Sequence, residues 1–319
     1  MEITYAPHTV LDIPTTIDVD GAPDIADPHV IKVGDTWYLY ATNAKDGQQV
    51  WSSEDLATWK PQGMAWTPTP GTWNEGGQVW APHVHAGGGK YYLYYTANTM
   101  VGVAIADSPT GPFEEVYDHP LVGGGYGGVG DGVFRWAESG DPEYDFDEFS
   151  IDAFLLVTSD DELYLYTTRY MPLSQIQVIR MKDLVTPSGD PPVVVLEPDV
   201  QSWESLVNEA PWVEEVDGVF YLTYSGNGAD LQDYGLGLAV ADHPTGPFEK
   251  QTDNPFLKKN PEAEFWGPGH HCIVDGAFDD RLLFYHTKVS TGKGFDRRLR
   301  YVPVSYQDDR TFQLDVPQP

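Results

Sequence analysis

The chain has 319 residues, with 49 acidic and 18 basic side chains and a formal net charge of -31 at pH 7. Such a charge repels nucleic acids and anionic lipid headgroups, so we expect neither a nucleic acid nor a membrane as a partner. The 32 glycines, 26 prolines, 19 tyrosines and 10 tryptophans favour many short strands joined by tight turns over long helices.

Five aromatic and β-branched segments recur along the chain, and each is typical of a buried strand. In chain order they are TWYLYAT (36–42), KYYLYYT (90–96), ELYLYTT (162–168), VFYLTYS (219–225) and RLLFYHT (281–287). A second run that is typical of a strand precedes each of them, and these runs open with ADPHV, WAPHV, SIDAF, NEAPW and PGHHC. The spacings of 54, 72, 57 and 62 residues suit a repeating unit of three or four antiparallel strands.

Five such units predict an all-β protein that folds as a five-bladed β-propeller, with residues 1–319 forming a single domain. Residues 1–20 are expected to supply a strand that closes the ring against the fifth blade. Residues 120–150 are predicted to form a long loop of the third blade, because they are rich in glycine and acidic residues. In a propeller, the first strand of each blade lines the central channel, so residues that open these strands face one mouth.

Three carboxylates open first strands in this way: Asp27, Asp152 and Glu209, with His270 at the corresponding place in the fifth unit. One such carboxylate would be read as a turn or capping residue, but three at equivalent positions favour a shared site. A buried carboxylate is costly unless it is hydrated, paired or used. Crowded carboxylates also push their proton affinities apart, which provides the acid and the base that cleavage of a glycosidic bond requires.

Aromatic side chains near the same strand starts are candidates for stacking on sugar rings. Trp80, Phe154 and Trp266 are predicted to bind substrate, with packing between blades as the alternative for each. The only basic cluster lies at residues 297–300, and Arg297 is expected to bind a substrate hydroxyl or to hold a channel carboxylate. A surface ion pair is the alternative for this arginine.

Other chemistries lack their motifs: there is no nucleophile elbow, no zinc-binding helix and no P-loop. The single cysteine, Cys272, excludes an intramolecular disulfide and is expected to be a small buried residue. The first residues resemble no secretory signal, and no apolar run is long enough to span a membrane. We therefore expect a soluble chain, either cytoplasmic or secreted, and its oligomeric state stays open.

The acidic residues are dispersed and accompany only ten lysines. This pattern is typical of proteins from salt-loving organisms, in which high ionic strength screens the self-repulsion. An ordinary acidic secreted enzyme is the alternative.

The order and spacing of the motifs resemble glycoside hydrolase family 43, five-bladed propeller enzymes that attack glycans containing arabinose or xylose. The matching segments run from ADPHVIKVGDTWYLYAT to GPGHHCIVDGAFDDRLLFYHT and cover residues 27–287. This resemblance implies that Asp27 is a general base that activates water and Glu209 a general acid. It implies that Asp152 orients the acid and tunes its pKa, and that the anomeric configuration is inverted. It also implies a Ca²⁺ or other ion in the channel near His270.

From the resemblance we expect a hydrolase of α-L-arabinofuranosyl or β-D-xylosyl linkages in oligosaccharides or polysaccharides. Arabinofuranosyl substrates are favoured because no C-terminal β-sandwich follows the fifth unit, whereas relatives that release xylose often carry one. A catalytically inactive carbohydrate-binding propeller is one alternative. A propeller glycosidase for another sugar, such as a fructan, is the other, although its N-D-P-N-type first motif is missing here. Loops at the channel mouth decide between exo and endo action, and they are the least predictable part of the chain.

Overall fold

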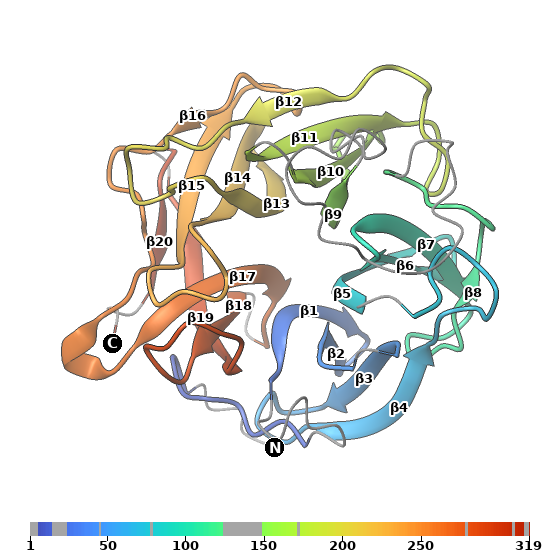
Figure 1. Cartoon of the computed structure of the whole chain (residues 1–319), viewed down its shortest axis with the longest axis horizontal. Coiled ribbons are helices and arrows are strands. Elements are labelled where there is room, and N and C mark those ends of the chain that lie inside the picture. Colours follow the sequence, from blue (N-terminus) through green and yellow to red (C-terminus); the bar gives the residue numbers. More distant parts are fainter. Residues whose placement is uncertain are drawn as a thin grey trace.

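The structure is a computed structural model, and it describes residues 6–14, 24–44, 46–76, 79–123, 149–170, 173–277, 280–307, 310–315 and 319. Five four-stranded antiparallel sheets are arranged around a central axis (Figure 1). The prediction of an all-β, five-bladed propeller is therefore confirmed. Most of the loop predicted at 120–150 lies outside the described residues, as do residues 1–5 and 15–23 of the N-terminal region. No helix in the described part of the chain is both long and apolar enough for a membrane span.

Each blade is a simple meander in which the order of strands in space is their order in the chain. Blade 1 contains β1 (Ala26–Val33), β2 (Thr36–Thr42), β3 (Gln48–Ser53) and β4 (Lys60–Trp66). Blade 2 contains β5 (Val79–Gly87), β6 (Lys90–Ala97), β7 (Met100–Ala106) and β8 (Glu114–Glu115). Blade 3 contains β9 (Ser150–Val157), β10 (Leu163–Tyr170), β11 (Ser174–Met181) and β12 (Val193–Leu196).

Blade 4 contains β13 (Asn208–Val216), β14 (Val219–Gly226), β15 (Gly235–Ala241) and β16 (Glu249–Lys250). Blade 5 contains β17 (Trp266–Asp275), β18 (Arg281–Lys288), β19 (Arg297–Tyr306) and β20 (Phe312–Leu314). A short 3-10 helix, Pro261–Ala263, precedes blade 5. The aromatic segments of the sequence are thus the second strands, and the runs that precede them are the first strands, next to the axis.

Aromatic side chains of the second strands fill the space within and between the blades. Tyr95 on β6 and Tyr224 on β14 are fully buried, and each faces a glycine on the third strand of its own blade. A Cβ atom at Gly102 or Gly237 would lie 2.3 or 2.6 Å from the ring of the facing tyrosine. Glycine is required at these positions because the tyrosine ring occupies the space that a side chain would need.

Every first strand contains a β-bulge near its start, and the bulge begins with a residue in the left-handed backbone region. These residues, with their φ angles, are Asp27 (51°), Ala81 (46°), Asp152 (56°), Ala210 (53°) and His270 (38°). We predicted from the sequence that Glu209 shares the register of Asp27, Asp152 and His270, and this was wrong by one residue. The bulge of blade 4 begins at Ala210, so Glu209 is instead equivalent to Trp80 of blade 2.

A ring of hydrogen bonds joins each bulge to the blade before it. The N–H of each bulge residue donates to a side chain at the end of the preceding second strand, at a fixed position of the repeat. The five bonds run from Ala81 to Thr42 (2.9 Å), Asp152 to Thr96 (3.2 Å), Ala210 to Thr168 (3.2 Å), His270 to Ser225 (2.9 Å) and Asp27 to the His286 Nδ1 (3.3 Å). These bonds satisfy buried N–H groups and hold a strained backbone conformation in place.

The described part of the N-terminal segment lies along the third strand of blade 5. The His8 N–H donates to the Tyr301 carbonyl (2.8 Å) and the Leu11 N–H to the Leu299 carbonyl (2.9 Å). Both acceptors belong to β19, which β20 contacts further along its length. Residues 8–11 are thereby attached to the last blade.

The hydrogen-bonded ring predicts a stability effect. Replacing Thr96 by Val keeps the side-chain shape but leaves the buried Asp152 N–H without this acceptor, so we expect a loss of about 1 to 3 kcal/mol in the free energy of unfolding. Urea denaturation measures the change. The control is Thr9→Val, at an exposed threonine, and an equal effect of the two substitutions would contradict the assigned role.

Candidate active site

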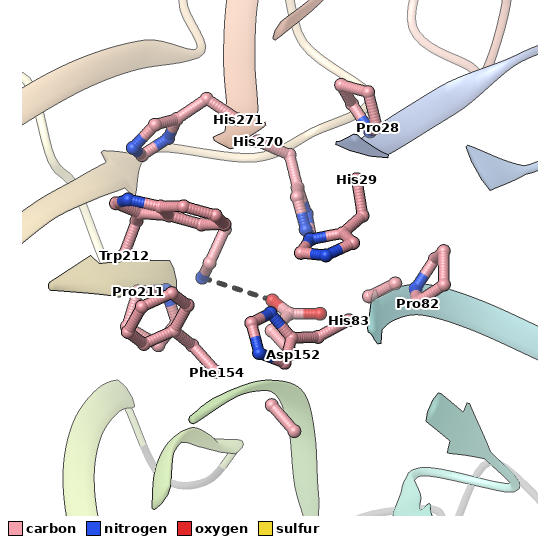
Figure 2. Close-up of a pocket in the computed structure, with 13 residues that line it drawn as sticks. Pro28, His29, Pro82, His83, Asp152, Phe154, Pro211, Trp212, His270 and His271 are labelled. Atoms are coloured by element: carbon pink, nitrogen blue, oxygen red, sulfur yellow. Dashed lines mark hydrogen bonds between the residues drawn. The ribbon is translucent and has the colours of Figure 1, made fainter. Parts of the chain in front are cut away.

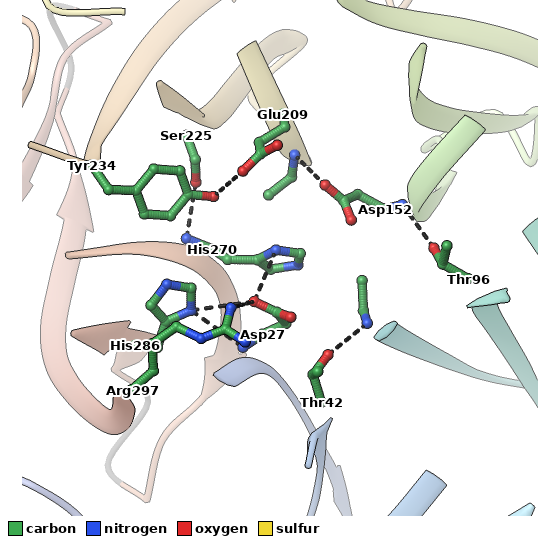
Figure 3. A network of polar contacts seen from close by, with 12 residues as sticks. Asp27, Thr42, Thr96, Asp152, Glu209, Ser225, Tyr234, His270, His286 and Arg297 are labelled. Carbon is green, nitrogen blue, oxygen red and sulfur yellow. Dashed lines mark hydrogen bonds and ion pairs between the residues drawn. The ribbon is translucent and has the colours of Figure 1, made fainter. Parts of the chain in front are cut away.

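Three carboxyl groups from three blades meet at one mouth of the channel (Figure 3). Asp27, Asp152 and Glu209 are 7%, 7% and 9% exposed. The charge of Asp27 raises the pKa values of both other groups, and the charge of Glu209 raises that of Asp152, so the three groups share one electrostatic environment. The structure therefore brings the predicted carboxylates together.

Asp27 is surrounded by nitrogen-containing side chains. Its Oδ1 lies 3.3 Å from the Nδ1 atoms of His270 and His286 and 3.4 Å from a terminal nitrogen of Arg297. Burial raises the pKa of Asp27, but His270, Arg297 and His286 lower it by more than burial raises it. The pKa of Asp27 consequently lies well below its usual range. The guanidinium carries a permanent charge, and Asp27 is consequently ionised at neutral pH.

Arg297 is held in place by Asp24, a residue that the sequence analysis missed. The Arg297 Nε donates to Oδ1 of Asp24 (3.0 Å), and a terminal nitrogen donates to Oδ2 (2.9 Å). The guanidinium also lies 4.7 Å from the ring centre of Phe295. Of the roles expected for Arg297, this geometry supports the holding of a channel carboxylate. Asp24 opens no recurring segment of the sequence, although it lies three residues before Asp27.

Asp152 fixes the backbone beside Glu209. Its Oδ2 accepts hydrogen bonds from the Ala210 N–H (3.1 Å) and the Thr168 hydroxyl (3.4 Å). Burial and the charges of Glu209 and Asp27 raise the pKa of Asp152 well above its usual value, more than these hydrogen bonds lower it. Asp152 therefore holds a proton more strongly than a free aspartate does, and it contacts the peptide group that follows Glu209.

Glu209 accepts a hydrogen bond from Tyr234, whose hydroxyl lies 2.6 Å from Oε1. Burial and the charge of Asp27 raise the pKa of Glu209 to about 7, while the Tyr234 hydrogen bond and Arg297 act in the opposite direction. A carboxyl group with such a pKa exchanges its proton readily near neutral pH. The surroundings thus separate the three pKa values: that of Asp27 is lowered, that of Asp152 is raised, and that of Glu209 is raised to about 7.

A layer of rings lines the hollow that also contains Asp152 (Figure 2). Its members follow the bulges and are His29, His83, Phe154, Trp212 and His271. Phe154 is 6% exposed, and its ring centre lies 4.6 Å from that of Trp212 and 4.9 Å from that of His83. These contacts support the packing alternative for Phe154, and its predicted stacking on a sugar remains a proposal.

The two remaining aromatic candidates, Trp80 and Trp266, lie at the starts of β5 and β17. Both are half-buried. Each lies at the end of its strand that carries the bulge, and part of its surface is exposed for contact with a ligand. Their predicted role in substrate binding remains a proposal.

His270 was predicted to hold an ion in the channel. Burial lowers the pKa of His270 to about 4, although the charge of Asp27 raises it, so the imidazole is neutral at pH 7. Calcium prefers six to eight oxygen ligands, whereas the groups near His270 are other imidazoles and a carboxylate already paired with Arg297. No group of three or more possible metal ligands occurs among the described residues. This surrounding does not fit a calcium ion bound directly by the protein.

Comparison with known proteins agrees with this geometry. The sequence profile described as "Glycosyl hydrolases family 43" matches residues 22–312, which include every residue of the site. The chain belongs to glycosyl hydrolase family 43. This membership agrees with the resemblance noted in the sequence.

Relatives of this family 43 protein include two named fungal enzymes. Alpha-L-arabinofuranosidase 43 of Humicola insolens is 26% identical over 92% of this chain and 62% of its own length. Beta-D-galactofuranosidase xynD of Aspergillus niger is 26% identical over 88% of this chain and 79% of its own. The crystal structure of a thermostable family-43 glycoside hydrolase has a TM-score of 0.79 and 28% identity, covering 99% of this chain and 97% of that one. The chain spans less than two thirds of the Humicola enzyme.

The pairing of Arg297 with Asp27 predicts a change in pH dependence. Replacing Arg297 by Gln removes the positive charge that lowers the pKa of Asp27, so this carboxylate takes up a proton at higher pH. We expect the acidic limb of the profile of kcat/KM against pH to move up by about 1 to 3 pH units. Arg180→Gln, at an exposed arginine paired with Glu162, is the control and leaves the limb in place. An unmoved limb in the Arg297 variant would show that this arginine does not act on the base.

Proposed function

We propose that the protein hydrolyses α-L-arabinofuranosyl linkages by a single displacement that inverts the anomeric configuration. The observation that carries this proposal is the meeting of three buried carboxyl groups in one hub, where the surroundings lower the pKa of Asp27 and raise the pKa values of Asp152 and Glu209. Cleavage with inversion needs a base that is ionised and an acid that is protonated at the same pH. Asp27 is the proposed base and Glu209 is the proposed acid.

In the proposed reaction, Asp27 removes a proton from a water molecule, whose oxygen forms a bond to the anomeric carbon. The bond from this carbon to the glycosidic oxygen breaks, and Glu209 transfers its proton to that oxygen. Asp27 ends protonated and Glu209 ionised, and exchange of protons with solvent restores both. Arg297 and its partner Asp24 hold Asp27 in place without changing their own charges.

Asp152 supports the acid in two ways. Its hydrogen bond with the Ala210 N–H fixes the peptide next to Glu209. In its neutral form it also places no additional negative charge beside the acid, so the pKa of Glu209 stays near neutrality. An ionised Asp152 would raise the pKa of Glu209 further and would weaken it as a proton donor.

The choice of an arabinofuranosyl substrate is supported by the names of the two relatives described above. One is called an arabinofuranosidase and the other a galactofuranosidase, and both names specify a five-membered sugar ring. β-D-Xylosyl linkages are the alternative substrate. Half-buried Trp80 and Trp266 are proposed to contact the sugar.

The assigned roles of Asp27 and Glu209 predict the behaviour of two variants. Asp27→Asn and Glu209→Gln should each lower kcat on an arabino-oligosaccharide by about 10² to 10⁴, because each removes one proton-transfer group. Turnover of 4-nitrophenyl α-L-arabinofuranoside, β-D-galactofuranoside and β-D-xylopyranoside measures the sugar preference. Proton NMR of the first product identifies its anomer. The control is Glu215→Gln, and retained activity in both site variants would remove the assignment.

The raised pKa of Glu209 predicts the alkaline limit of activity. The acid works only when protonated, so kcat/KM should fall as the pH rises through about 7. The lowered pKa of Asp27 keeps the base ionised throughout the mildly acidic range. A profile of kcat/KM from pH 4 to 10 tests both statements. Full activity at pH 9 would show that Glu209 is not the acid.

A further inference from the structure

Tyr234 contacts the general acid but belongs to none of the recurring segments of the sequence. It lies in the connection between β14 and β15, is fully buried, and its hydroxyl is 2.6 Å from Glu209 Oε1. A tyrosine hydroxyl can both donate and accept a hydrogen bond. Its direction relative to Glu209 decides which oxygen of the acid can carry the proton.

The backbone determines this direction through Ser225. The His270 N–H donates to Ser225 Oγ (2.9 Å), and an amide can only donate. The hydrogen of Ser225 is therefore free to point elsewhere, and an interaction with Ser225 lowers the pKa of Tyr234. When Ser225 donates to the Tyr234 oxygen, the hydrogen of Tyr234 points to Glu209. This arrangement is a chain of donors from the backbone of blade 5 to the acid of blade 4, and Figure 3 shows its first and last bonds, from the His270 N–H to Ser225 and between Tyr234 and Glu209.

Packing prevents the Tyr234 ring from leaving this position. A Cβ atom at residue 269 would lie 2.0 Å from the ring, so Gly269 is required for the tyrosine to fit. A second contact is a parallel stack on His286, the cross-strand partner of Gly269, with ring centres 5.6 Å apart and 10° between the planes. His286 in turn contacts Asp27. The ring is thus packed against both Gly269 and the imidazole that contacts Asp27.

We propose that Tyr234 and Ser225 are positioning residues of the general acid, which keep Glu209 Oε1 as a hydrogen-bond acceptor so that Oε2 carries the transferable proton. The proposal rests on the proposed function, in which Glu209 is the acid. An undirected carboxyl group would hold its proton on either oxygen and would present it to the leaving group only part of the time. The donor chain removes this ambiguity before substrate binds.

The main test compares two buried tyrosines of blade 4. Tyr234→Phe removes the hydroxyl next to Glu209. The matched control Tyr224→Phe removes a hydroxyl that lies 2.6 Å from Glu204. The substrates are arabinobiose, whose leaving group needs a proton, and 2,4-dinitrophenyl α-L-arabinofuranoside, whose leaving group does not.

For Tyr234→Phe we expect kcat on arabinobiose to fall about tenfold, which is less than the loss expected when a general acid is removed altogether. KM should stay within about twofold of the original value. The dinitrophenyl substrate should be turned over at nearly the original rate. The basic limb should move to higher pH, because the Tyr234 hydrogen bond lowers the pKa of Glu209. The control variant should show neither change. Equal losses on the two substrates, or the same behaviour in both variants, would overturn the proposal.

Ser225 provides a second test with its own rescue. Ser225→Ala removes the group that directs Tyr234 and should reproduce the selective loss on arabinobiose. Ser225→Thr should restore most of it, because threonine accepts the corresponding bulge N–H at Thr42, Thr96 and Thr168. If Ser225→Thr were as impaired as Ser225→Ala, the hydroxyl would not be the active feature and the proposal would fail.

A titration without substrate separates this inference from the proposed function. Glutamate labelled with carbon-13 at the side-chain carboxyl reports the pKa of Glu209 by NMR, with Glu209→Gln identifying the signal. The pKa should be higher in Tyr234→Phe than in the original protein and unchanged in Tyr224→Phe. An unchanged value in Tyr234→Phe would overturn the proposal. Absence of hydrolysis of any pentoside would instead remove the proposed function and leave this titration valid.

Discussion

The ring of hydrogen bonds between bulge amides and neighbouring second strands is the constraint on which the rest of the structure depends. Each first strand contains, near the axis, one residue in the left-handed backbone region. This conformation costs about 1 to 3 kcal/mol for a residue other than glycine. The preceding blade stabilises it by accepting a hydrogen bond from the buried N–H of that residue. The five bonds therefore join the blades in a closed cycle and set the places from which side chains enter the mouth of the channel.

The fifth bond of this cycle differs chemically from the other four. Hydroxyl groups accept at four junctions, whereas His286 accepts at the junction between the last and first blades. An imidazole is larger than a hydroxyl group, and its flat face can stack on Tyr234 while Nδ1 contacts Asp27. The element that closes the ring thus also connects the surroundings of Asp27 with those of Glu209. Stability and site geometry share the same contacts here.

Local pattern accounts for most of the fold and for part of the site. The five aromatic segments, their spacing and the strands before them predicted the architecture, and Asp27 and Asp152 were placed in equivalent positions correctly. Glu209 was assigned the same register because its motif, NEAPW, looks like the others, but the bulge begins one residue later. The sequence left two roles open for Phe154, and its ring contacts with His83 and Trp212 appear only in the folded chain. Periodicity predicts strands well, and it does not locate the point at which a bulge shifts the register.

The sequence by itself determined the number of blades, the strands that surround the axis and the identity of the three acidic groups, because these follow from short repeats and alternation along the chain. Only the tertiary structure decided how each group is protonated. The pKa of Asp27 depends on Arg297 and on two histidines of blade 5, and that of Glu209 depends on Tyr234 and on burial by several blades. Such partners lie far away in the chain, and electrostatic energies depend on distances that exist only after the ring has closed.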